Sequence, residues 1–211
     1  MSHSYKYFTF LSVFFVTVLL ISNIVSTKIT DLTWFVFDAG TLLFPLAYIL
    51  GDVLTEVYGF KKARAVIWMG FFSTFFLALM TAIVGALPPA AEWANQGAYE
   101  AILGLTPRIV LASLTAYTLG SFVNAFILAR MKVMTQGKHL WMRTIGSSVV
   151  AQGIDTVLFV LIAFWGVLPN ELLITIAVSN YVFKLAIEII ATPVTYRAVA
   201  FLKSNEGVDH Y

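Results

Sequence analysis

Five ionisable side chains lie within stretches of the sequence that are otherwise apolar: Asp52, Glu56, Asp155, Lys184 and Glu188. On insertion scales, a charge at the centre of a membrane-spanning helix costs at least about 2.5–3.5 kcal/mol. Four carboxylates beside one ammonium also leave excess negative charge, which protonation, a bound cation or a cationic ligand must offset. These residues therefore predict a polar cavity inside a membrane protein, suited to a ligand that carries hydrogen-bond donors or positive charge.

Polar residues recur every three or four positions in these stretches, which places them on shared faces of helices. Asn23 adds an amide in the first apolar stretch, and Phe44 and Tyr48 offer aromatic faces on which a flat ligand can stack. We predict no catalytic residues and no metal ligands. The predicted substrate-binding residues are Asp52, Glu56, Asp155, Lys184, Glu188, Asn23, Asn124, Gln152, Asn180, Tyr48 and Phe44.

A purely structural arrangement of the charges is the alternative. Lys184 can pair with Glu188, or with a carboxylate on another helix, only to hold the helices together. This explains a single residue more easily than the whole set, because the remaining carboxylates would stay uncompensated.

The composition indicates which elements must position these side chains. The chain has 211 residues, of which 60% are hydrophobic and only 11% charged, whereas soluble domains carry roughly 25% charged residues. A spanning helix needs about 20 apolar residues, so the sequence predicts an all-α, polytopic membrane protein with six transmembrane helices around a central polar cavity. We expect one transmembrane domain over residues 1–211, with spans near 8–27, 41–58, 65–86, 107–130, 144–168 and 171–201.

The basic residues predict the orientation of the spans. Lysine and arginine concentrate in cytoplasmic loops, and here they alternate along the chain. The predicted cytoplasmic segments hold Lys6, Lys61, Lys62, Arg64, Arg130, Lys132, Lys138, Arg143 and Lys203. Both termini are therefore predicted to be cytoplasmic.

Several functional classes are disfavoured by composition and motif content. A net charge of only +2 argues against nucleic acid as a direct partner. The chain has no cysteine and three histidines far apart in sequence, so we expect no metal site and no cofactor. Nucleophile-elbow and phosphate-loop motifs are absent from the sequence, which disfavours an intramembrane enzyme. A homodimer is compatible with so few helices.

Short motifs along nearly the whole chain resemble those of the bacterial queuosine precursor transporter family, also described as vitamin uptake transporters. The most specific segment is residues 51–59, Gly-Asp-Val-Leu-Thr-Glu-Val-Tyr-Gly, with the basic segment 61–64 that follows it. The resemblance also rests on residues 22–24, 40–46, 106–108, 137–141 and 181–184, and on the region around Asp155.

The resemblance implies import of queuosine precursors across the bacterial inner membrane, for salvage into transfer RNA. The implied substrates are 7-cyano-7-deazaguanine and 7-aminomethyl-7-deazaguanine. Either molecule presents N–H donors that suit a carboxylate, in agreement with the cavity predicted from the charges. The alternative is a substrate-binding subunit of an energy-coupling-factor vitamin transporter, which would need an ATPase module as partner.

Overall fold

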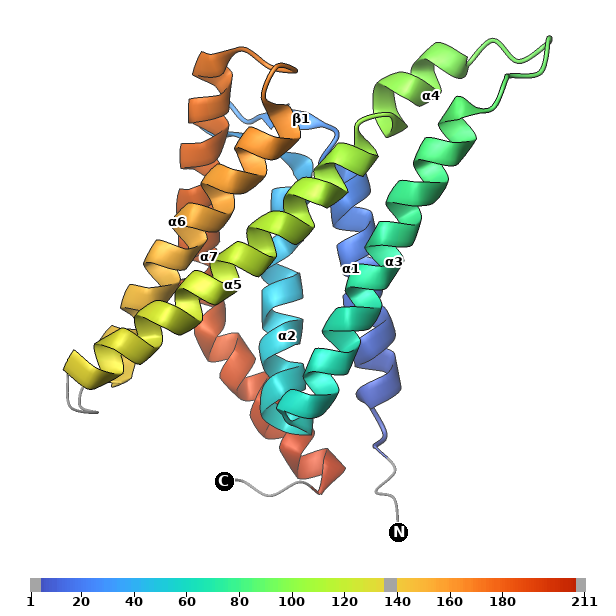
Figure 1. Cartoon of the computed structure of the whole chain (residues 1–211). Coiled ribbons are helices and arrows are strands. Elements are labelled where there is room, and N and C mark those ends of the chain that lie inside the picture. The colour runs from blue at the N-terminus through green and yellow to red at the C-terminus, as the bar shows by residue number, and fades with distance from the viewer. Residues whose placement is uncertain (1–4, 135–139, 208–211) are drawn as a thin grey trace.

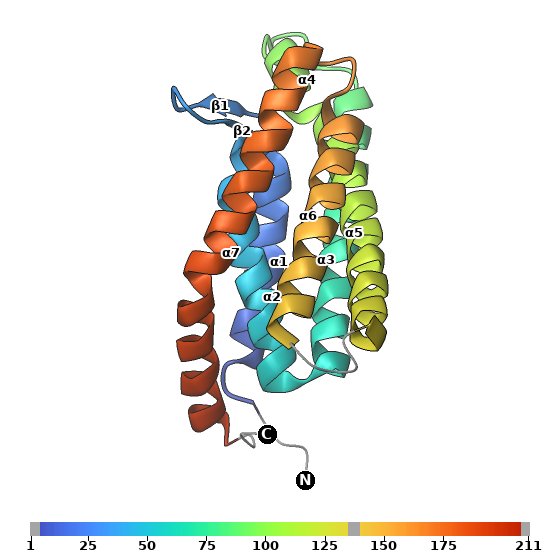
Figure 2. The same ribbon diagram turned by 90° about the vertical axis from the view of Figure 1, so that its left-hand side faces the viewer.

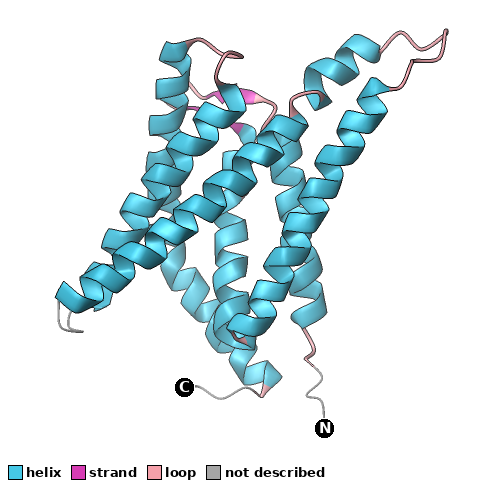
Figure 3. Cartoon of the chain, viewed as in Figure 1, coloured by secondary structure: helices cyan, strands magenta, loops and turns pink. Residues whose placement is uncertain are grey.

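The computed structural model describes residues 5–134 and 140–207 as a helical bundle with one short hairpin (Figures 1 and 3). The segment 137–139 lies outside the described residues; it belongs to one of the motifs quoted above and includes Lys138. In chain order the elements are α1 (Phe8–Val25), β1 (Ile29–Asp31), β2 (Val36–Asp38), η1 (Ala39–Leu42), α2 (Phe44–Tyr58), α3 (Phe60–Ala86), α4 (Gln96–Leu103), α5 (Thr106–Met134), α6 (Leu140–Phe164) and α7 (Asn170–Glu206).

The all-α, polytopic architecture is confirmed. Within the described residues, five helical segments are long and apolar enough to cross a membrane: α1, α3, α4 with α5, α6 and α7. The predicted count of six also needs α2, which has 15 residues against the roughly 20 of a typical span. The number of spans therefore stays a prediction, although each predicted span corresponds to one helix of the bundle.

The turn between α2 and α3 is tighter than the sequence suggested. Gly59 has φ +82°, a left-handed conformation that glycine adopts without steric cost. Because this single residue reverses the chain, α3 begins at Phe60 rather than near residue 65. The basic residues Lys61, Lys62 and Arg64 consequently lie on the first turns of α3 and not in a loop.

Two small elements of the fold were not predicted from the sequence. An antiparallel hairpin pairs β1 with β2, Ile29 opposite Asp38, in a segment expected to be a loop. The short helix α4 lies in the connection between α3 and α5. The strands have three residues each, too few to give a recognisable alternating pattern.

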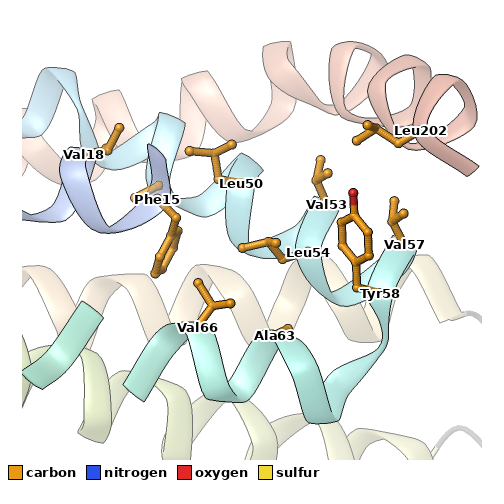
Figure 4. Packing of buried hydrophobic residues seen from close by; sticks show 11 residues of the cluster. Phe15, Val18, Leu50, Val53, Leu54, Val57, Tyr58, Ala63, Val66 and Leu202 are labelled. Carbon is orange, nitrogen blue, oxygen red and sulfur yellow. The ribbon is translucent and has the colours of Figure 1, made fainter. Parts of the chain in front are cut away.

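Two separate apolar clusters hold the bundle together. The first joins α1, α2 and α3 to the far end of α7, where Leu202 lies near Val53, Val57 and Tyr58 (Figure 4). The second joins α5 and α6 to the first half of α7, and its fully buried members include Ile109, Phe164 and Ile176. The helix α7 thus takes part in both clusters, with Pro193 between its two contact regions.

The outer surface of the bundle is strongly apolar. Several helices expose large hydrophobic side chains. Examples are Trp68 and Phe72 on α3, Phe122 on α5 and Ile189 on α7. Such a surface suits lipid tails, since contiguous apolar patches of this kind are rare on soluble monomers.

The start of α1 and the end of α7 lie at the same end of the bundle (Figures 1 and 2). The carboxylate of Glu206 accepts hydrogen bonds from the backbone N–H groups of Lys6 and Tyr7, each at 2.8 Å. The turn into α3 is at this end too, because the Lys62 ammonium lies 3.5 Å from the centre of the Tyr5 ring. We call this the terminal end and the opposite one the hairpin end.

Candidate functional site

A cavity of about 170 Å³ lies between the two halves of the bundle, one built around the α1–α2–α3 cluster and the other around the α5–α6 cluster. A cavity of about 150 Å³ takes a benzene-sized ring, so this one is of the size that admits a flat heterocycle. Six helices contribute to its wall: α1, α2, α3, α5, α6 and α7. The polar members of the wall are Asn23, Tyr48, Asp52, Thr55, Thr74, Ser113, Tyr117, Asp155 and Lys184.

One wall of the cavity carries an ion pair. The Lys184 ammonium on α7 donates to Asp155 Oδ2 on α6 at 2.8 Å, and the side chains are only 4% and 14% exposed. The same ammonium lies 5.2 Å from the centre of the Phe44 ring, within range of a cation–π contact. The pair is electrically neutral, so its hydrogen-bonding groups can serve a ligand without imposing net charge.

Asp52 is the carboxylate of the cavity that remains uncompensated. In the part of the chain that the structure describes, it forms neither an ion pair nor a hydrogen bond. It is also exposed, as is the neighbouring cavity residue Thr55. Both of these exposed residues lie on the half of α2 nearer the terminal end.

A second unsatisfied acceptor belongs to Asn23. This residue is 1% exposed, and its amide nitrogen donates to the Leu19 carbonyl at 2.8 Å. Its amide oxygen is buried without a partner among the described residues. Buried polar atoms are nearly always hydrogen-bonded, so this oxygen is a ready acceptor for a ligand N–H.

Aromatic rings supply the apolar part of the wall. Phe44 and Phe159 meet edge to face with centroids 6.0 Å apart, and Phe71 and Tyr117 do so at 5.2 Å. Together with Tyr48, these rings offer flat surfaces beside the carboxylates. The arrangement combines stacking with acceptors for N–H groups, which suits a planar, donor-rich ligand.

The structure brings six of the eleven predicted residues to the cavity. These are Asn23, Phe44, Tyr48, Asp52, Asp155 and Lys184. The Lys184 partner is Asp155, on another helix, and not Glu188.

The other five predicted residues lie outside the cavity wall. Glu56 accepts from Lys203 at 2.7 Å, and Asn180 donates to Asp38 at 2.7 Å. Glu188 accepts a hydrogen bond from Gln152. Asn124 has a buried amide oxygen without a partner in the described residues. Their role in binding stays a prediction, because helical spacing places residues on one face without fixing what that face meets.

Asp38 was not among the predicted site residues. It lies between the first two predicted spans, yet it is fully buried and accepts from Ser26, Thr41 and Asn180 at 2.8, 2.9 and 2.7 Å. The signal was faint: only the sequence Asp-Ala-Gly-Thr immediately before an apolar helix. In the described residues there is no group of three or more metal-ligating side chains.

Comparisons with known proteins give the family. Residues 38–198 match the family described as "Putative vitamin uptake transporter". A "Probable queuosine precursor transporter" of Bacillus subtilis (strain 168) is 30% identical over 186 residues, which cover 88% of this chain and 81% of that protein. The chain belongs to the queuosine precursor transporter family.

Another member of the queuosine precursor transporter family is more distant. The "Queuosine precursor transporter" of Escherichia coli (strain K12) is 27% identical over 190 residues, covering 88% of this chain and 83% of that protein. No solved structure gives a significant match to the chain. The family consists of transporters, so the predictions of a non-enzymatic, multi-pass transporter of the bacterial inner membrane are confirmed.

Proposed function

We propose that this chain imports queuosine precursors, namely 7-cyano-7-deazaguanine, 7-aminomethyl-7-deazaguanine or both, through the cavity between the two halves of the bundle. The names of its relatives support the substrate class. The observation that carries the proposal for the site is Asp52, an exposed and uncompensated carboxylate in the wall of a cavity inside a membrane protein.

The chemistry of the wall fits a deazaguanine. Its N1–H and exocyclic amine are parallel donors that one carboxylate can accept together, and Asp52 is the free carboxylate. The ligand carbonyl is an acceptor for the Lys184 ammonium, and Asn23 Oδ1 accepts a further N–H. In the aminomethyl compound, the added cation finds net negative charge because the Lys184–Asp155 pair is already neutral.

The test is uptake of each labelled deazaguanine by cells that cannot synthesise queuosine precursors. The Asp52→Asn variant keeps the shape of the side chain but removes its charge and one acceptor. We expect at least a tenfold loss of uptake at low substrate concentration, because a hydrogen bond to a charged group contributes about 1.5–3 kcal/mol. Glu171→Gln makes the same chemical change at an exposed position of the first turn of α7 and serves as the control.

Two outcomes would overturn parts of the proposal. Full uptake by Asp52→Asn would remove Asp52 from the site. Uptake that requires co-expression of an ATPase module, with which the chain co-purifies, would replace this proposal by the energy-coupling-factor alternative.

Orientation and assembly belong to the same proposal. We place the terminal end on the cytoplasmic side, because Lys61, Lys62 and Arg64 lie at that end. Single cysteines introduced at Lys61 and at Trp34, which is 92% exposed beside the hairpin, report the two sides, since the chain contains no cysteine of its own. A membrane-impermeant maleimide should label only the cysteine at position 34 in intact cells.

A homodimer is tested separately, by measuring the mass of the detergent-solubilised protein.

A further inference from the structure

The buried carboxylate Asp38 joins three elements at the hairpin end of the bundle. Its Oδ1 accepts from Ser26 at the end of α1, and its Oδ2 accepts from Thr41 in η1 and from Asn180 in α7. Asp38, Ser26 and Thr41 are fully buried, and Asn180 is 1% exposed. A fully buried carboxylate held by neutral donors alone calls for a functional explanation.

Each of these three elements continues directly into the cavity wall. Asn23 lies one turn before Ser26, Phe44 follows Thr41 by three residues, and Lys184 lies one turn after Asn180. Phe37, next to Asp38, is 2% exposed and stacks on Phe183, next to Lys184, with centroids 6.0 Å apart. The residues around Asp38 therefore form a continuous buried layer between the cavity and the hairpin end.

The packing around Gly40, where the chain turns, leaves no room for a side chain. A Cβ atom on Gly40 would lie 1.9 Å from Ser26 Oγ and 2.5 Å from the Ser22 carbonyl oxygen. Asp38 and Thr41 thus flank a residue that packs directly against the end of α1. Asn180 supplies the hydrogen bond that crosses from Asp38 to α7.

The Asn180 amide is only half satisfied in this arrangement. Its nitrogen donates to Asp38, but its oxygen is buried without a partner among the described residues. A buried unsatisfied acceptor costs free energy, and a second position of α7 that hydrates or pairs this oxygen would recover that cost. The part of α7 that would move belongs to the α5–α6 cluster, not to the α1–α2–α3 cluster.

We propose that Asp38 and Asn180 form the gate that closes the cavity toward the hairpin end, and that their hydrogen bond breaks when the cavity opens to that side. This rests on the proposed function only in taking the cavity as the transport site. The structure then corresponds to the state that is closed at the hairpin end and open at the terminal end, where Asp52 and Thr55 are exposed. Asp38 and Asn180 act as positioning residues, since neither lines the cavity.

The test measures access to the cavity without any substrate. A Ser113→Cys reporter places a thiol in the wall on α5, in a chain without native cysteine. A membrane-impermeant maleimide is added to the hairpin side of oriented vesicles, and the labelling rate of folded, membrane-inserted protein is measured. In this background Asn180→Leu removes the donor at nearly constant volume. Asn170→Leu, at the exposed start of α7, is the matched control.

We expect Asn180→Leu to speed labelling from the hairpin side at least about tenfold, because a hydrogen bond to a charged group is lost. The exchanged pair Asp38→Asn with Asn180→Asp restores the bond in the opposite sense, although an amide nitrogen at this place no longer accepts from Thr41, and should return the rate toward that of the parent. An unchanged rate in Asn180→Leu would overturn the gate, and so would fast labelling that the exchange does not reverse. If the leucine variant does not insert, Asn180→Ser, which shortens the donor, takes its place. Its labelling rate is then interpreted in the same way. Because no deazaguanine is used, failure of the gate and failure of the proposed substrate are told apart.

Discussion

Lys184 on α7 and Asp155 on α6 form a salt bridge of 2.8 Å at the wall of the cavity, almost out of reach of water. The contact joins a helix shared by both apolar clusters to one that belongs only to the second. Removing one partner from such a pair leaves an uncompensated charge, whereas removing both does not. The pair therefore allows its structural role to be separated from its role in binding.

We predict that Asp155→Asn and Lys184→Gln each destabilise the solubilised protein by about 3–5 kcal/mol, and that the double variant recovers much of this loss. Thermal unfolding of the three variants gives the comparison. Uptake should be abolished in all three, because the double variant restores neutrality but not the ammonium. Normal uptake by the double variant would assign the pair to structure alone.

Glycine at position 40 is a second testable feature. Gly40→Ala should destabilise the protein by at least about 1–3 kcal/mol, the usual cost of overpacking, because backbone as well as side-chain atoms block the Cβ. Gly97→Ala is the matched control, since nothing lies within 4 Å of its Cβ position in α4. There alanine should stabilise the helix by up to about 1 kcal/mol. Equal thermal stability of the two variants would contradict this packing.

The Glu206 carboxylate also holds the terminal end together. It accepts from two backbone N–H groups before α1 and from the Tyr58 hydroxyl at 2.9 Å. Glu206→Ala should therefore cost about 1.5–3 kcal/mol, more than Tyr58→Phe, which removes one of these bonds. Thermal unfolding and limited proteolysis before α1 provide the measurements. The assignment fails if the two variants behave alike.

Glu56 was predicted from the sequence to bind substrate, but the structure places it outside the cavity wall. Its side chain is 59% exposed and pairs outside the cavity with Lys203, whose side chain is only 9% exposed, so the loss of the Glu56 charge leaves a buried ammonium without its partner. We expect Glu56→Gln to destabilise the protein by more than the roughly 1 kcal/mol of an exposed pair, and to leave the half-saturating substrate concentration unaltered. A rise in that concentration as large as the one caused by Asp52→Asn would restore Glu56 to the binding site.

The spans were predictable because a lipid-facing helix needs a long apolar run, whatever its neighbours are. The run at 8–27 became α1 at Phe8–Val25, and the run at 144–168 became α6 at Leu140–Phe164. The boundary of α3 was not predictable in the same way. It depends on one positive φ angle at Gly59, which the apolar pattern does not record.

The cavity residues were predictable only in part. Asp52 and Asp155 stand out because carboxylates are rare in apolar helices. Asn180 and Lys184 share a face of α7, yet one meets Asp38 and the other meets the cavity. That difference arises from the position of the hairpin against α7, a long-range contact that no local spacing encodes. Asp38 and Glu206 were missed for the same reason, since both are buried by segments distant in sequence.

The bond between Tyr7 and Glu206 spans 199 positions of the chain. During biosynthesis the first helix enters the bilayer long before the residue that fixes its start has been translated. The N–H groups of Lys6 and Tyr7 gain their carboxylate partner only after α7 has been made, and until then water must satisfy them. A chain that stops before position 206 would still pack its first helix against α2 and α3, but the start of that helix would lack its carboxylate anchor.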